Sequence, residues 1–483
     1  MGLKFNEKDF YTSSNSFSLL PFKFLTLDNG KEIIVSEAGD YLIEDGGTVK
    51  ALINRNIDFD SRLYKRLLAN NIVVESYKSG HLDFLANRIR TKRSNLISSS
   101  SLHILVLTLR CNHTCHYCQV SRVTENKDQY DMSIVDLENS INLMLAYPSE
   151  YITMEFQGGE PLLAFDLLKY AVEYCLAMNH GRKKINFVVC TNGTVYNDEI
   201  LEFCRKHSIL ISTSLDGPQH IHDSNRKKTK NSSYEEVLNG LEVFRLYMGK
   251  ERVSALMTTS RLSLEYPREI IDSYVSNDFN SIFLRPISPY GFALKSPKKN
   301  HYDNESFLKF YREALLYIID INLSGRYFRE DFASIILKKI LTPGNSQYVD
   351  LASPAGAINS VLAYNYDGNV YATDESRMLA EIGDYRFKLG HISEGLNLLK
   401  SQNAIDVYKN SLNEGLNGCA DCALNLYCGA DPVHNYATQG DIYGHRANST
   451  FCSRNMNIIL LLISLMDENK EVKSVFRNWI NGN

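Results

Sequence analysis

The hydrophobic pattern alternates between two periods from residue 102 to about residue 290. Short apolar runs, typical of buried strands, are separated by longer runs with apolar residues every three or four positions, typical of amphipathic helices. The strand-like runs are His103–Leu109, Tyr151–Phe156, Ile185–Cys190, Ile209–Ser214, Arg252–Met257 and Ser281–Pro286. The helical runs are Ser133–Leu145, Ala164–Met178, Asp198–His207, Tyr234–Tyr247 and Tyr266–Asn277.

Six strand–helix units in succession predict an α/β fold with parallel strands and right-handed crossovers. Six units are too few for a closed eight-stranded barrel, so the pattern predicts an open, partial (β/α)6 barrel over residues 102–295. In such a barrel the functional residues lie at the C-terminal ends of the strands.

Residues 1–95 form a separate block. Short strand-like runs are broken at Asn29-Gly30 and Gly39-Asp40, and Asn-Gly between such runs is a hairpin signal. Helical patterns follow over Gly46–Asn54 and Asp60–Asn70, so we predict a winged-helix-like module with a β-ribbon. Such modules bind extended peptides by strand addition; the alternative is that the block only covers the open edge of the barrel. The basic, then Ser-rich residues 87–101 predict a linker.

The C-terminal third reads as helices followed by a second domain. Residues 296–350 hold the helical patterns Glu305–Asp320 and Phe328–Leu341 and are expected to bridge the barrel to residues 351–483. Within that last domain, Asp367-Gly368 between two apolar runs predicts a hairpin.

Composition and charge narrow the class of protein. The 483 residues are 44% hydrophobic and 22% charged, as in ordinary globular chains. The net charge of −4 favours neither nucleic acid nor an anionic membrane as partner. The N-terminal stretch lacks the apolar core of a signal peptide, and the longest apolar run, Ile458–Met466, is too short to span a bilayer. We therefore expect a cytoplasmic protein.

Seven of the ten cysteines fall into two clusters. Cys111, Cys115 and Cys118 follow the first strand-like run with CxxxCxxC spacing; three thiolates can hold three irons of a [4Fe–4S] cube and leave the fourth iron open to chemistry. Cys419, Cys422, Cys428 and Cys452 can close a metal site, and zinc is an alternative to iron at both places. Three further cysteines in apolar contexts are expected to be core thiols: Cys175, Cys190 and Cys204.

Polar, Gly-rich segments recur after successive strands. They are Gln157-Gly158-Gly159-Glu160-Pro161, Thr191-Asn192-Gly193-Thr194, Ser214-Leu215-Asp216-Gly217-Pro218, His222-Asp223-Ser224-Asn225-Arg226 and Arg285-Pro286. Ordinary turn chemistry explains part of this recurrence. One ligand pocket facing the first three cysteines explains all of it.

These motifs resemble the radical S-adenosylmethionine (SAM) enzymes, over about 190 residues. The four-cysteine tail resembles the SPASM extension, which carries auxiliary iron–sulfur clusters. The likeness is nearest to the B-type radical SAM maturases of the His-Xaa-Ser peptide system, and it runs through LTLRCNHTCHYCQVS, IFLRPISPYGFA and YCGADPVHNYATQGDIYG.

The resemblance implies a role for each candidate residue. Cys111, Cys115 and Cys118 would bind the cluster, whose open iron SAM would chelate. Gly158, Gly159 and Glu160 would meet the amine of SAM, and Tyr117 would lie beside its adenine. Asn192, Ser214 and Arg226 would contact its carboxylate or ribose, with Arg285 as an alternative to Arg226. Reductive cleavage of SAM would then give a 5′-deoxyadenosyl radical that abstracts hydrogen from the substrate.

The tail departs from the full SPASM pattern, which has further cysteines. Ser353-Pro354-Ala355-Gly356, Tyr371-Ala372-Thr373 and Pro432 stand where three of them are expected. We therefore predict one auxiliary [4Fe–4S] cluster, on Cys419, Cys422, Cys428 and Cys452, and two clusters in total. Asp374 and Glu375 are candidates for a catalytic base or radical-site residue; the alternative is a pair of solvated loop carboxylates.

Three functions stay open on the sequence. The first is oxidative modification, such as crosslinking, of a ribosomally made precursor peptide, with a flavodoxin or ferredoxin as electron donor and a second radical SAM protein as a further candidate partner. The second is oxidation of a Cys or Ser to formylglycine in a partner enzyme, as in sulfatase maturation. The third is a zinc-stabilised scaffold without catalysis, which iron–sulfur absorbance and deoxyadenosine release would exclude.

Overall fold

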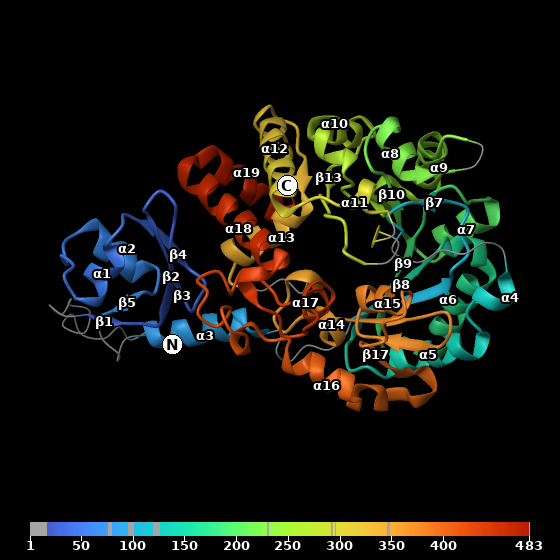
Figure 1. The fold of residues 1–483 in the computed structure, drawn as a ribbon, viewed down its shortest axis with the longest axis horizontal. Coiled ribbons are helices and arrows are strands. Elements are labelled where there is room, and N and C mark those ends of the chain that lie inside the picture. The colour runs from blue at the N-terminus through green and yellow to red at the C-terminus, as the bar shows by residue number, and fades with distance from the viewer. Residues whose placement is uncertain are drawn as a thin grey trace, which may run out of the picture.

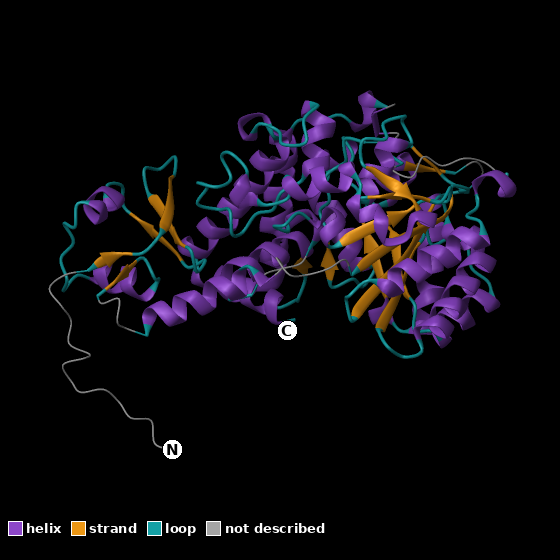
Figure 2. Cartoon of the chain, turned by 90° about the horizontal axis from the view of Figure 1, so that it is seen from below, coloured by secondary structure: helices purple, strands orange, loops and turns teal. Residues whose placement is uncertain are grey.

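The computed structural model describes residues 17–75, 80–94, 101–118, 126–228, 231–290, 293–294, 296–344 and 348–482. The N-terminal module lies at one end of an elongated molecule and the barrel at the other, with C-terminal helices between them (Figures 1 and 2). Within these ranges, none of the helices combines the length and apolar character that crossing a bilayer requires.

Five of the six predicted barrel strands pair side by side and parallel in one sheet, which confirms the α/β prediction. The eight-stranded sheet has the order β12-β10-β9-β8-β6-β15-β16-β17. The barrel strands are β6 (Leu102–Thr108), β8 (Tyr151–Gly158), β9 (Lys184–Cys190), β10 (Leu210–Ser214) and β12 (Val253–Leu256).

The sixth predicted strand is shorter than Ser281–Pro286. Only Ser281–Ile282 is a strand (β13), and it pairs with β14 (Arg329–Glu330) rather than with β12. The backbone N–H of Leu284 is held by the Glu330 carboxylate, at 3.1 Å. Pro286, which has no N–H to donate, reaches the barrel only through an isolated bridge to Thr259.

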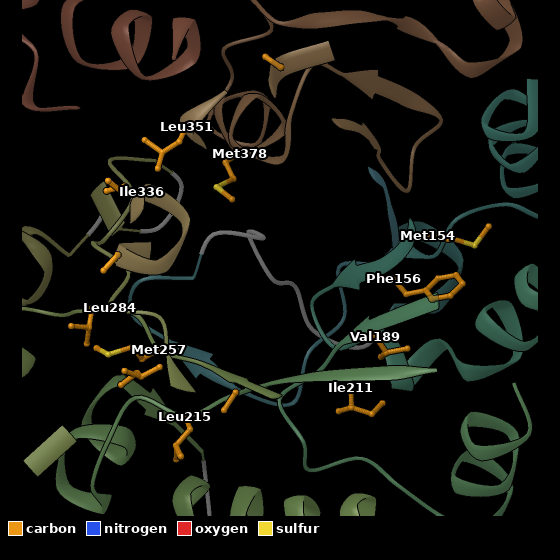
Figure 3. Packing of buried hydrophobic residues seen from close by; sticks show 14 of the residues in the cluster. Met154, Phe156, Val189, Ile211, Leu215, Met257, Leu284, Ile336, Leu351 and Met378 are labelled. Carbon is orange, nitrogen blue, oxygen red and sulfur yellow. The ribbon is translucent and has the colours of Figure 1, made fainter. Parts of the chain in front are cut away.

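Helices cover the outer face of the barrel sheet because its strands alternate in polarity. On β8, Ile152, Met154 and Phe156 are buried under helices, as Figure 3 shows for the last two, whereas Glu155 and Gln157 line the inside of the barrel. The helices of this part are α4 (Lys127–Tyr130), α5 (Ile134–Ala146), α6 (Phe165–Asn179), α7 (Asp198–Lys206), α8 (Gln219–Asn225), α9 (Ser233–Met248) and α10 (Pro267–Ser276).

The edge of the barrel beside β6 is covered by a C-terminal strand. β15 (Val361–Tyr364) pairs with β6 in parallel, and β16 (Asn369–Tyr371) and β17 (Lys388–His391) extend the sheet antiparallel. The Asp367-Gly368 hairpin is thus confirmed. The alternative in which the N-terminal block covers this edge is wrong, because that block pairs only its own strands among the described residues.

The N-terminal module has the two predicted hairpins in one antiparallel sheet, β2-β3-β4. The linker predicted at 87–101 is wrong over its first part, because residues 87–92 are helical; residues 95–100 lie outside the described ranges. The elements of this module are β1 (Ser18–Leu19), β2 (Phe22–Thr26), β3 (Glu32–Ser36), β4 (Tyr41–Glu44), α1 (Thr48–Ile53), α2 (Arg62–Ala69), β5 (Val73–Val74) and α3 (His81–Lys92).

Buried polar contacts join this module to the C-terminal part. The Lys92 ammonium donates to the carbonyl oxygens of Lys339 and Thr342 at the C-terminal end of α13, and the Tyr427 hydroxyl donates to Gly39 O. The remaining helices are α11 (Pro297–Asn300), α12 (Asn304–Leu323), α13 (Asp331–Leu341), α14 (Gly356–Asn359), α15 (Asp374–Ala380), α16 (Gln402–Lys409), α17 (Pro432–Gln439), α18 (Thr450–Glu468) and α19 (Lys470–Asn481).

Candidate functional site

The first cysteine loop is held in place by a short β-ladder. Its strand β7 (Thr114–Cys115) pairs antiparallel with β11 (Arg226–Lys227), so that Cys115 lies opposite Arg226. The loop closes on itself through the Cys118 N–H, which donates to Cys115 O at 3.3 Å. The three thiols are therefore carried on a braced segment at the C-terminal end of β6.

A cavity of about 430 Å³ opens inside the barrel at this end, a volume suited to a small-molecule ligand. The predicted residues that line it are Cys111, Cys115, Tyr117, Cys118, Gly158, Gly159, Asn192, Ser214, Arg226, Arg285 and Asp374. Of the residues predicted to contact SAM or to act in catalysis, Glu160 and Glu375 are not part of its lining. The strand-end segments recognised in the sequence thus converge on one pocket.

Two glycines let the backbone after β8 pass close to the cysteine loop. A Cβ on Gly159 would lie 2.2 Å from Arg110 O, and a Cβ on Gly158 would lie 2.3 Å from Thr108 O. Gly158 also has φ +150°, a conformation that side chains disfavour. No larger residue fits at either position without moving the loop.

Glu160 is buried and bonded to protein groups rather than exposed to the cavity. Its carboxylate accepts hydrogen bonds from the Asn192 N–H (2.7 Å), the Thr191 hydroxyl (2.8 Å) and the Leu162 N–H (3.0 Å). Burial raises the pKa of Glu160 to about 7. This carboxylate therefore joins the strand ends of β8 and β9.

Asp216 is the central residue that the sequence reading did not assign. It is fully buried, and its carboxylate accepts hydrogen bonds from the Arg226 Nε (3.2 Å), the Asn225 amide (3.1 Å) and the Tyr117 hydroxyl. The Arg226 guanidinium also lies over the Tyr117 ring, 5.4 Å from its centre. Asp216 thereby fixes two of the side chains expected to contact SAM, Tyr117 and Arg226. Its position in the polar segment after β10 was the available signal.

Asn192 is held by the cysteine loop itself. Its amide nitrogen lies 2.6 Å from the Asn112 side-chain oxygen and 3.0 Å from His113 Nδ1, while His113 Nε2 contacts the Ser233 hydroxyl. Burial lowers the pKa of His113 to about 3, so this imidazole is neutral. The histidine, which the sequence reading passed over, connects β9 to the loop.

The inside of the barrel is more polar than expected. Glu155, Gln157 and Ser212 line the cavity, and so does Cys190, which corrects its assignment as a core thiol. Burial raises the pKa of Glu155. The sequence feature that could have predicted this polar interior is the period-2 alternation of β8, in which polar residues occupy the inward positions. Cys175 and Cys204 are buried core thiols as predicted.

Asp374 and Glu375 begin α15 and point into different cavities. Thr373 caps the helix, and acids in a first turn stabilise the helix dipole. Asp374 lines the barrel cavity and pairs with the buried Arg377, at 3.0 Å, while Glu375 faces a second cavity and pairs with Arg285, at 3.5 Å. They are not solvated loop carboxylates.

The four C-terminal cysteines line one small cavity together. Cys452 is in the first turn of α18, where the Ser449 hydroxyl caps its N–H and the positive end of the helix favours a thiolate. The buried ammonium of Lys339 donates to Cys428 O at 2.7 Å. This groups the four residues as the tail spacing predicted.

Both sets of thiols suit iron–sulfur clusters. Burial raises the pKa of Cys111 and of Cys428 to about 12, and a bound metal would favour the thiolate form. No three His, Cys, Asp or Glu side chains of the described ranges converge closely enough to hold one metal ion. The cysteines of a [4Fe–4S] cube bind separate irons and need no such convergence.

Comparison with known proteins identifies a family for the barrel part of the chain. A family profile described as the radical SAM superfamily matches residues 105–273. The chain is 30% identical over 200 residues to an uncharacterized protein of Methanocaldococcus jannaschii, covering 41% of this chain and 64% of that protein. It is 24% identical over 287 residues to the cysteine-type anaerobic sulfatase-maturating enzyme of Clostridium perfringens, covering 57% of this chain and 74% of the relative.

Two solved structures share the fold. The native anSMEcpe structure with bound AdoMet and Cp18Cys peptide has a TM-score of 0.63 at 19% identity, and the match covers 78% of this chain and 99% of that one. Streptococcus suis SuiB bound to the precursor peptide SuiA has a TM-score of 0.51 at 14% identity, covering 91% of this chain and 99% of that one. The two structures show the same fold, and the family match shows a radical SAM domain over residues 105–273. A domain of this kind is that of an enzyme with a [4Fe–4S] cluster and SAM as cofactors.

Proposed function

We propose that this enzyme reductively cleaves SAM and oxidatively crosslinks side chains of a ribosomally made precursor peptide of the His-Xaa-Ser type. The observation that carries the proposal is the convergence of two cysteine sets, each on its own cavity, in a chain with a separate N-terminal module.

In this proposal the barrel cavity holds SAM. Cys111, Cys115 and Cys118 would ligate a [4Fe–4S] cluster, which would supply the electron for the reductive cleavage of SAM. Gly158 and Gly159 leave room for the amine, and Asn192, Ser214 and Arg226 or Arg285 contact the carboxylate or ribose. Tyr117 lies beside the adenine, and Asp216 orients Tyr117 and Arg226 by accepting a hydrogen bond from each.

The peptide and the redox balance account for the rest of the chain. Forming one bond between two side chains removes two hydrogen atoms, so the reaction needs an electron acceptor besides the SAM-derived radical. Cys419, Cys422, Cys428 and Cys452 are the residues of this chain suited to hold one. The β2-β3-β4 sheet would bind part of the precursor by strand addition. The likeness in fold to SuiB, whose structure was solved with the precursor peptide SuiA bound, supports a peptide substrate.

A second candidate is the oxidation of Cys or Ser to formylglycine in a partner enzyme. The likeness to the cysteine-type sulfatase-maturating enzyme favours it. The retention of cysteines for one auxiliary cluster rather than two counts against it.

Co-expression with a small His-Xaa-Ser precursor peptide, followed by tandem mass spectrometry, tests the proposal. A crosslink gives a mass loss of two hydrogens together with fragments that do not separate. An unchanged peptide, with SAM still cleaved to deoxyadenosine, refutes the crosslinking function. A product that reacts with a carbonyl probe supports the formylglycine alternative instead.

A further inference from the structure

A second cavity, of about 80 Å³, lies beyond the SAM cavity and shares Arg285 with it. The elements that form it meet in the middle of the molecule, between the barrel and α18 (Figure 1). They are the loop after β13, the first turn of α15, the N-terminal end of α17 and one face of α18. The volume is that of two or three water molecules, which suits the polar end of one side chain.

Carboxylates outnumber cations in the lining. Asp350, Glu375 and Asp431 face Arg285 and Arg454. The only other titratable nitrogen in the lining is on His434, and burial lowers its pKa to about 3, so it adds no charge. With every carboxyl ionised, the cavity has one negative charge in excess; with Glu375 protonated, the charges balance, and a bound cation would favour ionisation of Glu375.

The carboxylates are held in place rather than left in solvent. The Glu375 carboxylate pairs with Arg285. Asp350 accepts a hydrogen bond from the Tyr348 hydroxyl at 3.1 Å, and Asp431 accepts one from the backbone N–H of His434 at 2.8 Å. The pKa of Glu375 is raised to about 8, mainly by burial and further by repulsion from the charges of Asp350 and Asp374. A further cation beside them would relieve that repulsion.

The rest of the lining suits a peptide that carries such a cation. Tyr290, Phe307 and Phe332 present aromatic rings, which attract ammonium and guanidinium groups. Asn455 is 1% exposed, and neither its amide nitrogen nor its amide oxygen has a hydrogen-bond partner among the described residues. One donor and one acceptor side by side match the C=O and N–H of a peptide backbone.

A third cavity, of about 280 Å³, borders the second and shares Pro286, Ile287, Phe307 and Arg454 with it. An extended peptide in the third cavity could place the end of one side chain in the second.

We propose that the second cavity is a specificity subsite that binds a basic side chain of the substrate peptide, with Glu375 and Asp431 as its charge partners and Asn455 as the reader of the adjoining peptide group. This inference rests on the proposed peptide substrate and deepens it: the modified residue would have a basic neighbour in the sequence.

Peptide binding to the SAM-loaded, cluster-reconstituted enzyme tests the subsite without requiring turnover. Four fluorescein-labelled peptides would differ only in a central Lys, Arg, norleucine or Glu, and Kd would be measured by anisotropy under anaerobic conditions. The Lys and Arg peptides should bind at least about tenfold more tightly than the norleucine peptide, because buried charge pairs discriminate strongly. The Glu peptide should bind most weakly.

Two variants remove one charge each. Asp431→Asn keeps the cap of α17, because Asn and Asp cap helices equally well, and Glu375→Gln keeps the side-chain shape; each should reduce the preference for Lys over norleucine to less than about threefold. Glu468→Gln, at an exposed position on α18, should leave it unchanged.

Equal affinity for all four peptides, binding of none, or a preference unchanged in both cavity variants would overturn the subsite. Deoxyadenosine release and peptide mass are recorded on the same preparations. Loss of these signals refutes the proposed function, whereas loss of the charge preference alone refutes only the subsite.

Discussion

Replacing Asp216 with Asn should destabilise the cysteine loop and weaken the binding of SAM. The substitution keeps the size of the side chain but removes the charge that balances Arg226, whose side chain is only 12% exposed. An uncompensated buried charge of this kind costs about 3–5 kcal/mol. That is a large fraction of the 5–15 kcal/mol that stabilises a typical domain.

The loss should concentrate at the cysteine loop, because Arg226 pairs with Cys115 across the β7–β11 ladder. Hydrogen–deuterium exchange of residues 110–118 should accelerate, the urea midpoint should fall, and the Kd for SAM should rise by at least about tenfold, the factor that 1.4 kcal/mol corresponds to. Iron content measures whether the first cluster is still retained.

A double variant separates charge imbalance from loss of a SAM contact. Asp216→Asn combined with Arg226→Gln should recover part of the stability, because neither charge is then unpaired, while SAM binding stays weak. Glu202→Gln, which breaks an exposed pair with Arg205, is the matched carboxylate-to-amide control and should behave as the wild type. Exchange rates, SAM affinity and urea midpoint all unchanged in Asp216→Asn would refute the role assigned to this carboxylate.

Three further predictions concern other parts of the site. Gly159→Ala would place a Cβ 2.2 Å from a backbone oxygen of the cysteine loop and should weaken SAM binding at least about tenfold, whereas Gly415→Ala, with no atom within 4 Å, should not; equal binding in both would contradict the close approach. Cys452→Ser should lower iron from about eight to about four atoms per chain by losing the auxiliary cluster, and iron content equal to that of Cys175→Ala would argue against it. Burial raises the pKa of Glu330 to about 7 from its ordinary 4.5, so the stability that Glu330 contributes is present below about pH 4.5 and is lost as the pH rises through 7, by about 3 kcal/mol. Glu330→Gln should therefore flatten the dependence of the thermal midpoint on pH between about pH 5 and 8, and an unchanged slope would contradict this.

Local patterns were sufficient to predict the barrel and most of the residues that line its cavity. The strand runs carry their own periodicity, and a parallel sheet brings their C-terminal ends together. For that reason Gly158, Asn192 and Arg226 could be placed in one pocket from their positions after successive strands.

Features that depend on distant partners were not predictable in this way. β15 pairs with β6 although more than two hundred residues separate them, and the sequence of neither strand indicates its partner. Glu160 looked available to a ligand because its segment is a turn, yet Thr191 and Asn192, from the next strand, occupy its carboxylate. The sixth strand is short because Glu330, on another element, holds the Leu284 N–H.

The pairing of β15 with β6 makes the C-terminal domain indispensable to the barrel. A chain cut after Asp350 would leave one edge of β6 unpaired. Because β6 is apolar, its unpaired N–H and C=O groups would then template aggregation. Each domain then shields the other from misassembly during synthesis. The barrel, made first, has to wait for a strand that emerges more than two hundred residues later, and this interval is where a chaperone would matter most.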